Sequence, residues 1–154
     1  MPAVGAEYWT DEDRINVKKS KNFKELVKIA LIILKRMHQP VGQVCGPISS
    51  GGYDSIKKNL KLFYKTIKDL SKDRHIFNQV PFESPMQRIK KRMRKRQRYS
   101  HKRIGAQLLR EFYLPVFKSG YVKTLFFMPN WKTSKGAKWE HQQARRLGIR
   151  IVYL

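Results

Sequence analysis

The stretch FFMPNWKTSKGAKWEHQQARRLGIRIVYL, residues 126–154, decides the fold. It begins within an apolar run, Tyr121–Met128, that predicts a strand, and it ends in a second such run, Ile149–Leu154. Between them, Ser134–Gly148 has the periodicity of a helix, with Gly148 placed as its C-terminal cap. Because a helix usually links neighbouring parallel strands, this unit predicts an α/β fold.

Two more strands and two more helices are expected upstream. Val41–Cys45 and His75–Phe82 are short apolar runs that end at turn-forming residues, and each predicts a strand. The helix between them has an apolar inner face, and Asp54 is its expected N-cap. Another amphipathic helix, within residues 22–38, stops before Pro40 because the residue preceding a proline disfavours helix.

A length of 154 residues fits one ordinary domain. Residues 1–21 are expected to form a flexible N-terminal arm, and residues 22–154 a single α/β domain. Within it, residues 22–38 form an added helix and residues 86–103 a basic insertion, and a helix after Ile104 is expected to break at Pro115. The alternation of strands and helices predicts a doubly wound, flavodoxin- or Rossmann-like parallel sheet of four to five strands, with helices on both faces and an extra N-terminal helix.

Charge and composition narrow the ligand class. The chain has 34 Lys plus Arg against 11 Asp plus Glu, a formal net charge of +23, which favours phosphorylated small molecules or polyanions. The single cysteine, Cys45, excludes an intramolecular disulfide, and no metal-binding cysteine pattern is present, so no metal or cofactor is expected. No apolar run approaches the roughly 18 residues of a membrane span, and the first residues lack the order of a signal peptide. We therefore expect a cytoplasmic protein without membrane association.

Three polar, flexible segments follow predicted strands, at residues 46–52, 78–83 and 130–136. In an open α/β sheet, ligands bind beyond the carboxyl ends of the strands. The first and third segments lead into helices, whose N-terminal N–H groups suit an anion. Their serines and glycines form a candidate phosphate cradle: Ser49, Ser50, Gly51, Gly52 and Ser134. The same residue types also build turns and helix caps, so both interpretations stay open.

Glu140 is the one acidic residue of the stretch 126–154, in a chain that is otherwise strongly basic. It follows Gly136 by four residues and shares a helix face with Ala137 and Ala144. The helix dipole favours an anion near this end of the helix, and a carboxylate beside a sugar can attack the anomeric carbon. The alternative is a glutamate near the helix start held by one of the many surrounding cations.

The segments CGPISSGG, residues 45–52, and NWKTSKGAKWEHQQARRLGIRIVYL, residues 130–154, together resemble the nucleoside 2-deoxyribosyltransferase-like superfamily. The chain is particularly similar to a bacterial branch with a GPIS(T/S)GG loop, and the superfamily also contains deoxynucleoside monophosphate N-glycosidases. The resemblance covers residues 41–154, and Ser134-x-Gly136-x-x-x-Glu140 is its most specific element. It implies an enzyme of the N-glycosidic bond, either transferase or hydrolase, in which Glu140 is the nucleophile at C1′.

The resemblance also assigns a binding set. Gly46, Pro47 and Ile48 match the loop that closes over base and sugar, and Ser134 matches the phosphate-binding serine of the nucleotide hydrolases. With the positive charge, this favours a nucleoside or nucleotide ligand that is phosphorylated, and a homodimer or larger homo-oligomer is expected. Gln79, with Asn78 as its alternative, matches a polar residue at the end of the second strand. The remaining expected binding residues are Ser49, Ser50, Gly51, Gly52, Asn130 and Gly136.

The proton donor for the leaving base is less clearly marked. The family carries an aspartate in the helix before the third strand, and the nearest acid here is Glu111, with Glu83 as a second candidate. The family's aspartate at the start of that strand is replaced by the residues 121–123, Tyr-Val-Lys. His141 adjoins Glu140 in sequence, but helical neighbours point about 100° apart, which predicts a surface position for His141.

Residues 86–103 contain ten Lys or Arg and no acid. Such a run can neutralise nucleic-acid phosphates, although a solvated helical face or a lid over small phosphates gives the same pattern. The alternative function is therefore a nucleic-acid- or polyanion-binding module on the same fold without catalysis. Its candidate contacts are Arg88, Lys90, Lys91, Arg92, Arg94, Lys95, Arg96 and Arg98.

Overall fold

The computed structural model describes residues 4–97 and 100–154. These residues form one parallel sheet in the strand order β2-β1-β3-β4. In chain order the strands are β1 (Val41–Cys45), β2 (His75–Ile76), β3 (Val122–Phe127) and β4 (Arg150–Tyr153). The predicted α/β fold with a doubly wound parallel sheet is confirmed, and the strand order is that of flavodoxin-like folds.

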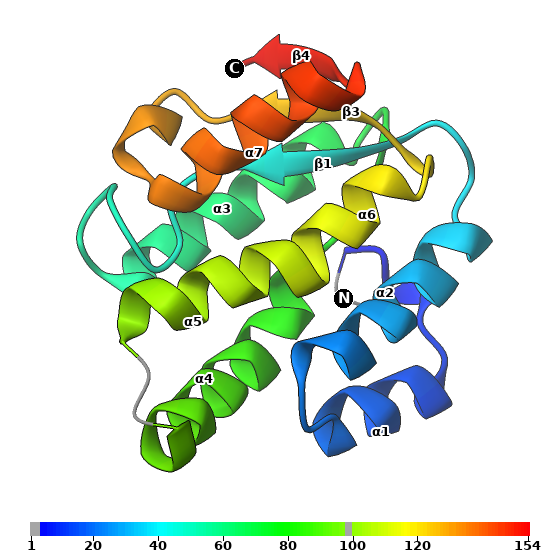
Figure 1. Ribbon diagram of the computed structural model, residues 1–154. Helices are drawn as coiled ribbons and strands as arrows, with labels where there is room; N and C mark the ends of the chain where they lie inside the picture. Colours follow the sequence, from blue (N-terminus) through cyan, green and yellow to red (C-terminus); the bar gives the residue numbers. More distant parts are fainter. Residues whose placement is uncertain (1–3, 98–99) are drawn as a thin grey trace.

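Helices cover both faces of the sheet. Figure 1 shows α3 (Ile56–Leu70) behind the sheet, and α6 (Leu114–Lys118) and α7 (Lys135–Leu147) in front of it. Successive side chains of β1 point to opposite faces of the sheet. Val44 packs with α3, while Cys45 belongs to the larger core on the other face. All of β1 is buried, as expected for a central strand covered on both sides.

The expectation of a loose arm through residue 21 is wrong for the described part of that segment. Asp11–Lys19 is a helix, α1, which packs on α2 (Phe23–Arg36). Thr10 and Asp13 form a reciprocal capping box at its start, and Asp13 also pairs with Arg36 of α2. Val17 then enters the core. Capping and one buried apolar contact thus order a segment whose composition is polar; residues 1–3 lie outside the described residues.

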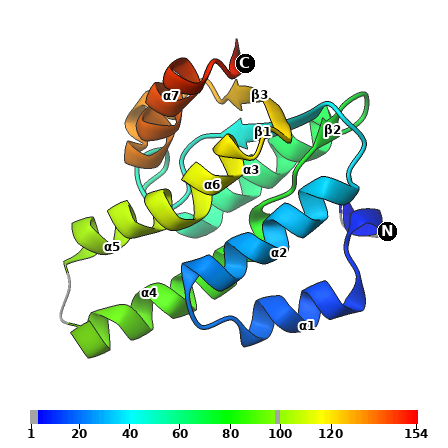
Figure 2. The ribbon, with the colours of Figure 1, turned by 45° about the vertical axis from the view of Figure 1, so that its right-hand side comes forward.

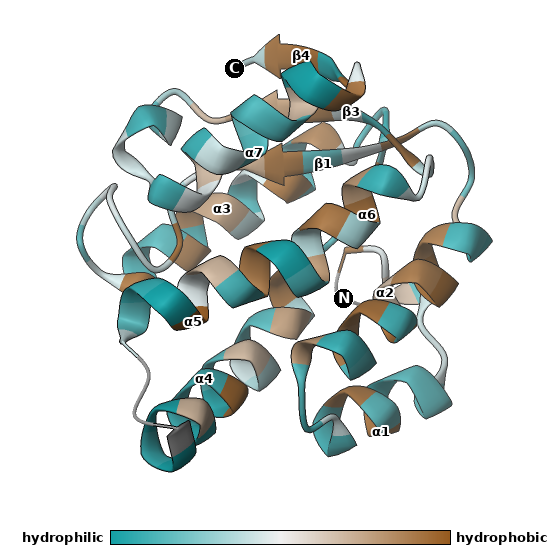
Figure 3. Ribbon diagram, viewed as in Figure 1, coloured by the Kyte–Doolittle hydropathy of each residue, from teal (hydrophilic) through white to brown (hydrophobic). Residues whose placement is uncertain are grey.

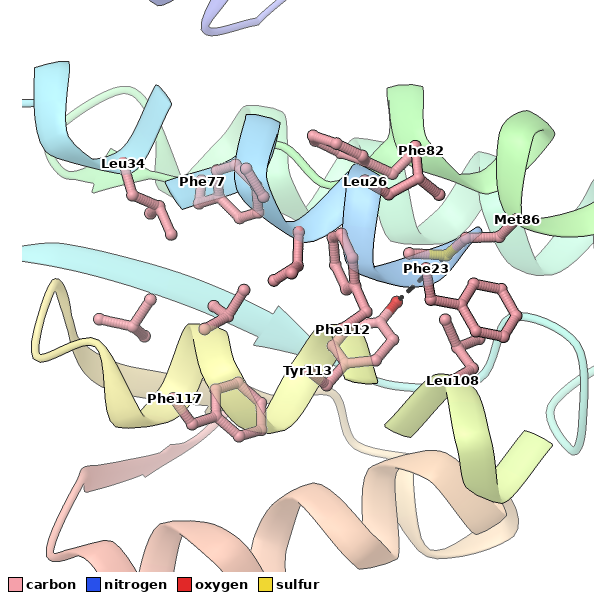
Figure 4. Close-up of a cluster of buried hydrophobic side chains, with 14 of the residues drawn as sticks. Phe23, Leu26, Leu34, Phe77, Phe82, Met86, Leu108, Phe112, Tyr113 and Phe117 are labelled. Atoms are coloured by element: carbon pink, nitrogen blue, oxygen red, sulfur yellow. Dashed lines mark hydrogen bonds between the residues drawn. The ribbon is translucent and has the colours of Figure 1, made fainter. Parts of the chain in front are cut away.

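The expected break at Pro115 is also wrong. α5 (His101–Leu108) continues through a π-helical turn, Leu109–Tyr113, directly into α6. A π-turn shifts the carbonyl groups that the proline ring would otherwise meet, so the helix passes Pro115 without ending. Figure 4 shows the consequence, because Phe112 and Tyr113 both project from this turn into the apolar cluster between α2 and α4 (Glu83–Gln97), where the Tyr113 hydroxyl donates to Met86 Sδ.

Two local boundaries differ from prediction. The second strand ends at Ile76, because the Asn78 side chain accepts the Val80 N–H at 3.1 Å and turns the chain into a 3-10 helix, Val80–Phe82. Asp54 does not cap α3, since it adopts a left-handed backbone with φ 53°. Ser55 caps α3 instead, and its Oγ accepts the N–H of Lys58 at 3.4 Å.

The basic insertion, residues 86–103, forms most of α4 and the start of α5. Figure 2 shows these two helices projecting away from the sheet, and Figure 3 shows that α4 is largely hydrophilic where α2 carries a hydrophobic face. Arg98 lies outside the described residues. Among the helices in the described ranges, none combines the length and apolar character that a membrane crossing requires.

Candidate functional site

The strand order reverses between β1 and β3. Cys45 pairs with Phe127 at the carboxyl ends of these neighbours. From there the chain leaves β1 for α3 on one face of the sheet and leaves β3 for α7 on the other. The loops 46–55 and 128–134 therefore lead to helices on opposite faces of the sheet, and open α/β sheets bind ligands at such a point.

A cavity of about 830 Å³ opens at this reversal, and we call it the switch-point cavity. It is lined by the loop after β1, the turn after β2, α4, α5 and the start of α7. Predicted residues that line it are Gly46, Ile48, Ser49, Ser50, Gln79, Ser134, Gly136 and Glu140, together with Lys90 and Arg94 of the basic segment. Predicted site residues outside the lining are Pro47, Gly51, Gly52, Asn130 and Glu111.

Gly51 and Gly52 shape the loop after β1 without lining the cavity. Both have positive φ angles, 72° and 62°, and a Cβ at Gly51 would collide with the carbonyl of Thr133. The Gly52 N–H donates to Thr133 Oγ1 at 2.8 Å, so the two strand-end loops meet directly. The turn-building interpretation therefore describes these glycines.

Asn59 of α3 fixes the same loop. Its side chain accepts the N–H of Tyr53 at 3.0 Å and donates to the carbonyls of Ile48 and Gly51 at 3.0 and 3.1 Å. These bonds hold the loop after β1 in one conformation before any ligand arrives. Sequence reasoning missed Asn59, although a buried asparagine beside the apolar face of a helix was a readable signal.

The first turn of α7 has donors to offer an anion. Ser134 is the N-cap, and its Oγ accepts the N–H of Ala137 at 3.1 Å. Ser50 Oγ accepts the N–H of Lys135 at 3.3 Å and so ties the β1 loop to this helix. The Gly136 N–H lies between these two satisfied groups, ahead of the first intrahelical bond. This N–H and the Ser134 O–H are donors that can still reach a bound anion.

Glu140 lies at the inner end of the cavity with only 6% of its surface exposed. The Cys45 thiol donates to its Oε2 at 3.4 Å. Burial raises the pKa of Glu140 to about 8, while the Cys45 hydrogen bond lowers it and the nearby Glu83 raises it further. Glu140 is in the second turn of α7, where the helix dipole has weakened, so burial dominates.

Glu83, the first residue of α4, is the second acid in the cavity and is 7% exposed. Burial raises its pKa to about 7, against the lowering effects of Lys90 and the Tyr113 hydroxyl. The pKa of Tyr113 is raised well above its ordinary value by burial and by Glu83 and Glu140, so this hydroxyl stays protonated. The negative charge of Glu83 contributes to the raised pKa of Glu140, and we call these two residues the carboxyl pair.

Two glutamines of the lining are short of partners. Gln79 is 2% exposed, and its Oε1 has no hydrogen-bond partner among the described residues. Gln87 Nε2 is also buried and has no hydrogen-bond partner among the described residues. Since buried polar atoms are nearly always hydrogen-bonded, a donor for Gln79 and an acceptor for Gln87 are expected from a ligand in the cavity.

Glu111 and His141 both lie away from this site. The Glu111 carboxylate accepts a hydrogen bond from Gln107 Nε2 at 3.1 Å, one turn earlier and outside the lining, so the structure does not bring it to Glu140. Of the two acids considered as proton donors from the sequence, Glu83 lines the cavity with Glu140 and Glu111 does not. His141 stacks on Trp131 and lies 2.7 Å from the Tyr153 hydroxyl, outside the cavity as predicted.

Several lining residues were not assigned to this site from the sequence. They are Gln87, His101, Lys102 and Tyr113. Cys45, which bonds Glu140 from behind the lining, was also not assigned. For α4 a signal existed, because Glu83, Gln87, Lys90 and Arg94 recur at helical spacing and share one face. Within the described ranges, no group of three or more His, Cys, Asp or Glu side chains is placed to bind a metal ion.

Comparison with known proteins gives one partial match. A family model described as Domain of unknown function (DUF4406) matches residues 113–153. That region contains β3, α7 and β4, with Ser134 and Glu140, while β1, its loop and α4 lie outside it. No curated protein and no solved structure matches the chain.

Proposed function

We propose that this protein breaks the N-glycosidic bond of a nucleoside or nucleotide, as a deoxyribosyltransferase or a deoxynucleoside monophosphate N-hydrolase, with Glu140 as the nucleophile at C1′. The observation that carries the proposal is the carboxyl pair. Two buried, interacting carboxyl groups share one cavity with anion donors at the start of α7. Retaining glycosidic chemistry requires this combination of a nucleophile and an acid beside the same bond.

The ligand would lie with its phosphate at the start of α7. Ser134 O–H and Gly136 N–H would donate to the phosphate, which the positive end of the helix also favours. Sugar and base would then lie along Gly46 and Ile48, within reach of the free Gln79 Oε1. This placement sets the anomeric carbon at the inner end of the cavity, beside Glu140.

The reaction would proceed in two displacements at C1′. A Glu140 carboxylate oxygen attacks C1′, the C1′–N bond breaks, and Glu83 gives its proton to the departing base. A glycosyl ester on Glu140 results. Glu83, now a carboxylate, then takes a proton from water or from the N–H of a second base, whose attack on C1′ releases Glu140. The Cys45 thiol would hold Glu140 in position, and the Tyr113 hydroxyl would lower the pKa of Glu83.

The test is chromatographic detection of free base. Purified protein is incubated with deoxynucleosides and their 5′-monophosphates, with and without an acceptor base. We expect base release by the unsubstituted protein and its loss in Glu140→Gln. Glu111→Gln is the discriminating comparison, because it removes the acid that lies outside the cavity. Retained release by Glu111→Gln supports the assignment, and release that persists in Glu140→Gln refutes it.

A second candidate, polyanion binding without catalysis, is favoured by the exposed cations of α4. Lys91, Arg92, Lys95 and Arg96 are all exposed, and in the ion pairs formed by the described residues none of them takes part. Binding of this kind weakens steeply with salt and is insensitive to Glu140. Salt-dependent binding without any base release would therefore support this candidate over the enzyme.

A further inference from the structure

The cavity extends well past the carboxyl pair along α4. Glu83, Gln87, Lys90 and Arg94 form one stripe on this helix and all line the cavity. Along α4 the stripe changes from a buried acid, Glu83, to an exposed base, Arg94. Eleven residues of α-helix separate its ends, which corresponds to about 16 Å.

The outer part of the cavity is cationic. The cations Lys90 and Arg94 of α4 are joined there by Lys102 and by the imidazole of His101, both from the start of α5, and we call these four residues the cationic rim. Arg94 Nη1 lies 3.0 Å from His101 Nε2, which holds the two helices together at this point. The ion pairs in the described part of the chain are formed elsewhere, around α1, α2 and α3, so no carboxylate neutralises Arg94 or Lys102.

The cationic rim and the anion donors of α7 lie on different walls. Figures 1 and 2 both place α5 between α7 and α4. α5 contributes Gly105 and Leu108 to the wall that separates the two regions. One phosphate can occupy only one of them, so a mononucleotide at the start of α7 would leave the rim without an anion.

We propose that the nucleotide in this site belongs to a single strand of nucleic acid, with one phosphate at the start of α7 and a following phosphate at the cationic rim. The choice of a nucleotide rests on the proposed function, and the inference that this nucleotide is part of a nucleic-acid strand goes beyond that function. A stacked strand rises about 3.4 Å along its axis for each nucleotide, so the stripe from Glu83 to Arg94, about 16 Å long, can extend along more than one nucleotide. The exposed cations of α4, Lys91, Arg92, Lys95 and Arg96, continue the positive surface outward from the rim.

A single strand fits better than a duplex. The carboxyl pair is buried at the inner end of the cavity, and C1′ of a stacked, paired nucleotide cannot reach such a depth without leaving the helix. A strand with unpaired bases can enter without that cost. Gln79 and Gln87, with free hydrogen-bonding atoms, would contact its base or sugar.

The first experiment measures binding without turnover. A fluorescently labelled six-residue single-stranded DNA is titrated into Glu140→Gln by anisotropy at several salt concentrations. Adding Arg94→Gln and Lys102→Gln should weaken binding about 10-fold or more and flatten the slope of log K against log salt by about 1 to 1.5. The matched control is Lys61→Gln with Lys68→Gln, two exposed lysines on α3 outside the cavity, which should change neither.

Three results of this titration would overturn the proposal. They are equal loss in the control and rim variants, binding to the duplex of the same sequence as tight as to the single strand, and displacement of the DNA by phosphatidylserine vesicles at lower phosphate concentration than by unlabelled strand. The last would identify an anionic lipid surface as the partner of these cations.

The second experiment separates this inference from the proposed function. Base release by the unsubstituted protein is compared for a monophosphate and a short single strand, with kcat/KM for each. We expect kcat/KM for the strand to be at least about 10-fold higher, and the rim variant to reduce that ratio. Cleavage of the monophosphate without binding or cleavage of the strand overturns the inference alone. Rim-dependent strand binding without base release from any substrate refutes the glycosidic function but leaves the strand site supported.

Discussion

The two ends of α4 place charged side chains in opposite environments. At its inner end Glu83 is buried beside Glu140, and the pKa of both carboxyls is raised by loss of water. At its outer end Arg94 and its neighbours are exposed, and they form no ion pair with a carboxylate in the described part of the chain. At the inner end burial disfavours the ionised form of the carboxyl groups, whereas at the outer end the cations stay hydrated.

This contrast shows how one helix can attract an anionic ligand at one end and provide a group for proton transfer at the other. Exposed cations act at long range and attract an anion, but each contributes little to stability. Buried carboxyls act only at contact, and their perturbed pKa values suit proton transfer near neutral pH. Lys90 lies between the two regimes, since burial lowers its pKa while Glu83 raises it. Substitutions at each end should therefore have different signatures.

Glu140→Gln should have the largest effect. It keeps the size of the side chain and removes the nucleophile, so base release should fall by about 10⁴-fold or more. Binding of single-stranded DNA, which depends on the outer end, should stay within about 2-fold. Single-turnover base release and anisotropy measure the two quantities. A parallel loss of binding and release would show that the two ends do not act separately.

Glu83→Gln should slow base release by about 10²- to 10³-fold, because it removes the proton donor but not the nucleophile. The loss should be smaller for a substrate whose leaving base needs no proton, such as a nitrophenyl deoxyriboside. Rates for both substrates in Glu83→Gln and Glu111→Gln measure this difference. Equal losses for the two leaving groups would assign Glu83 a structural role.

The inner end should also make stability depend on pH. The pKa of both carboxyls is raised in the fold from about 4.5, to about 7 for Glu83 and about 8 for Glu140. The folded state therefore holds protons more tightly, so this contribution is complete below pH 4.5 and is lost as pH rises through 7 and 8. Glu140→Gln removes its share and should be more stable than the unsubstituted protein at pH 9 by on the order of 5 kcal/mol.

Urea unfolding at pH 5, 7 and 9 measures the difference. The advantage of Glu140→Gln should grow with pH. The rim variant, Arg94→Gln with Lys102→Gln, should stay within about 0.5 kcal/mol of the unsubstituted protein at each pH, as is usual for exposed positions. An advantage that does not change with pH would mean that packing, not proton binding, explains the stability of Glu140→Gln.

Much of the fold was predictable because its signals are local. The alternation of apolar runs with helical periodicity gave β1, β3, α7 and β4 close to their observed bounds, and Gly148 ends α7 in the left-handed conformation. The errors arose where side chains from elsewhere decide the backbone. Arg36 of α2 helps to hold Asp13 of α1, and Asn78 turns the chain after Ile76 through its own amide.

The site was predictable in part for the same reason. Ser134 and Glu140 share one helix, so their spacing alone relates them to each other. The second acid of the cavity, Glu83, is 57 positions earlier in the chain and on a different helix, and the packing of α4 in the fold brings it into the same cavity. Glu111 is closer in sequence, but it lies outside the cavity because Tyr113 takes the inward position on that turn.

Lys90→Met should have the smallest effect, and it tests whether the two ends are coupled. Between about pH 7 and 8 the carboxyl pair holds one proton, and because the pKa of Glu140 is above that of Glu83, this proton is mainly on Glu140. The productive form, with Glu140 ionised and Glu83 protonated, is a minor part of the same singly protonated state, so base release should still follow a bell centred there. Lys90 lowers the pKa of Glu83. Removal of Lys90 should therefore raise the pKa of Glu83 and move the pH optimum of base release to a higher value. Lys91→Met removes the same charge one residue on, at an exposed position outside the cavity, and should leave the optimum in place. If both variants shift the profile equally, the general positive field of α4 would set the pKa of Glu83, and the outer cations would then tune the chemistry as well as attract the ligand.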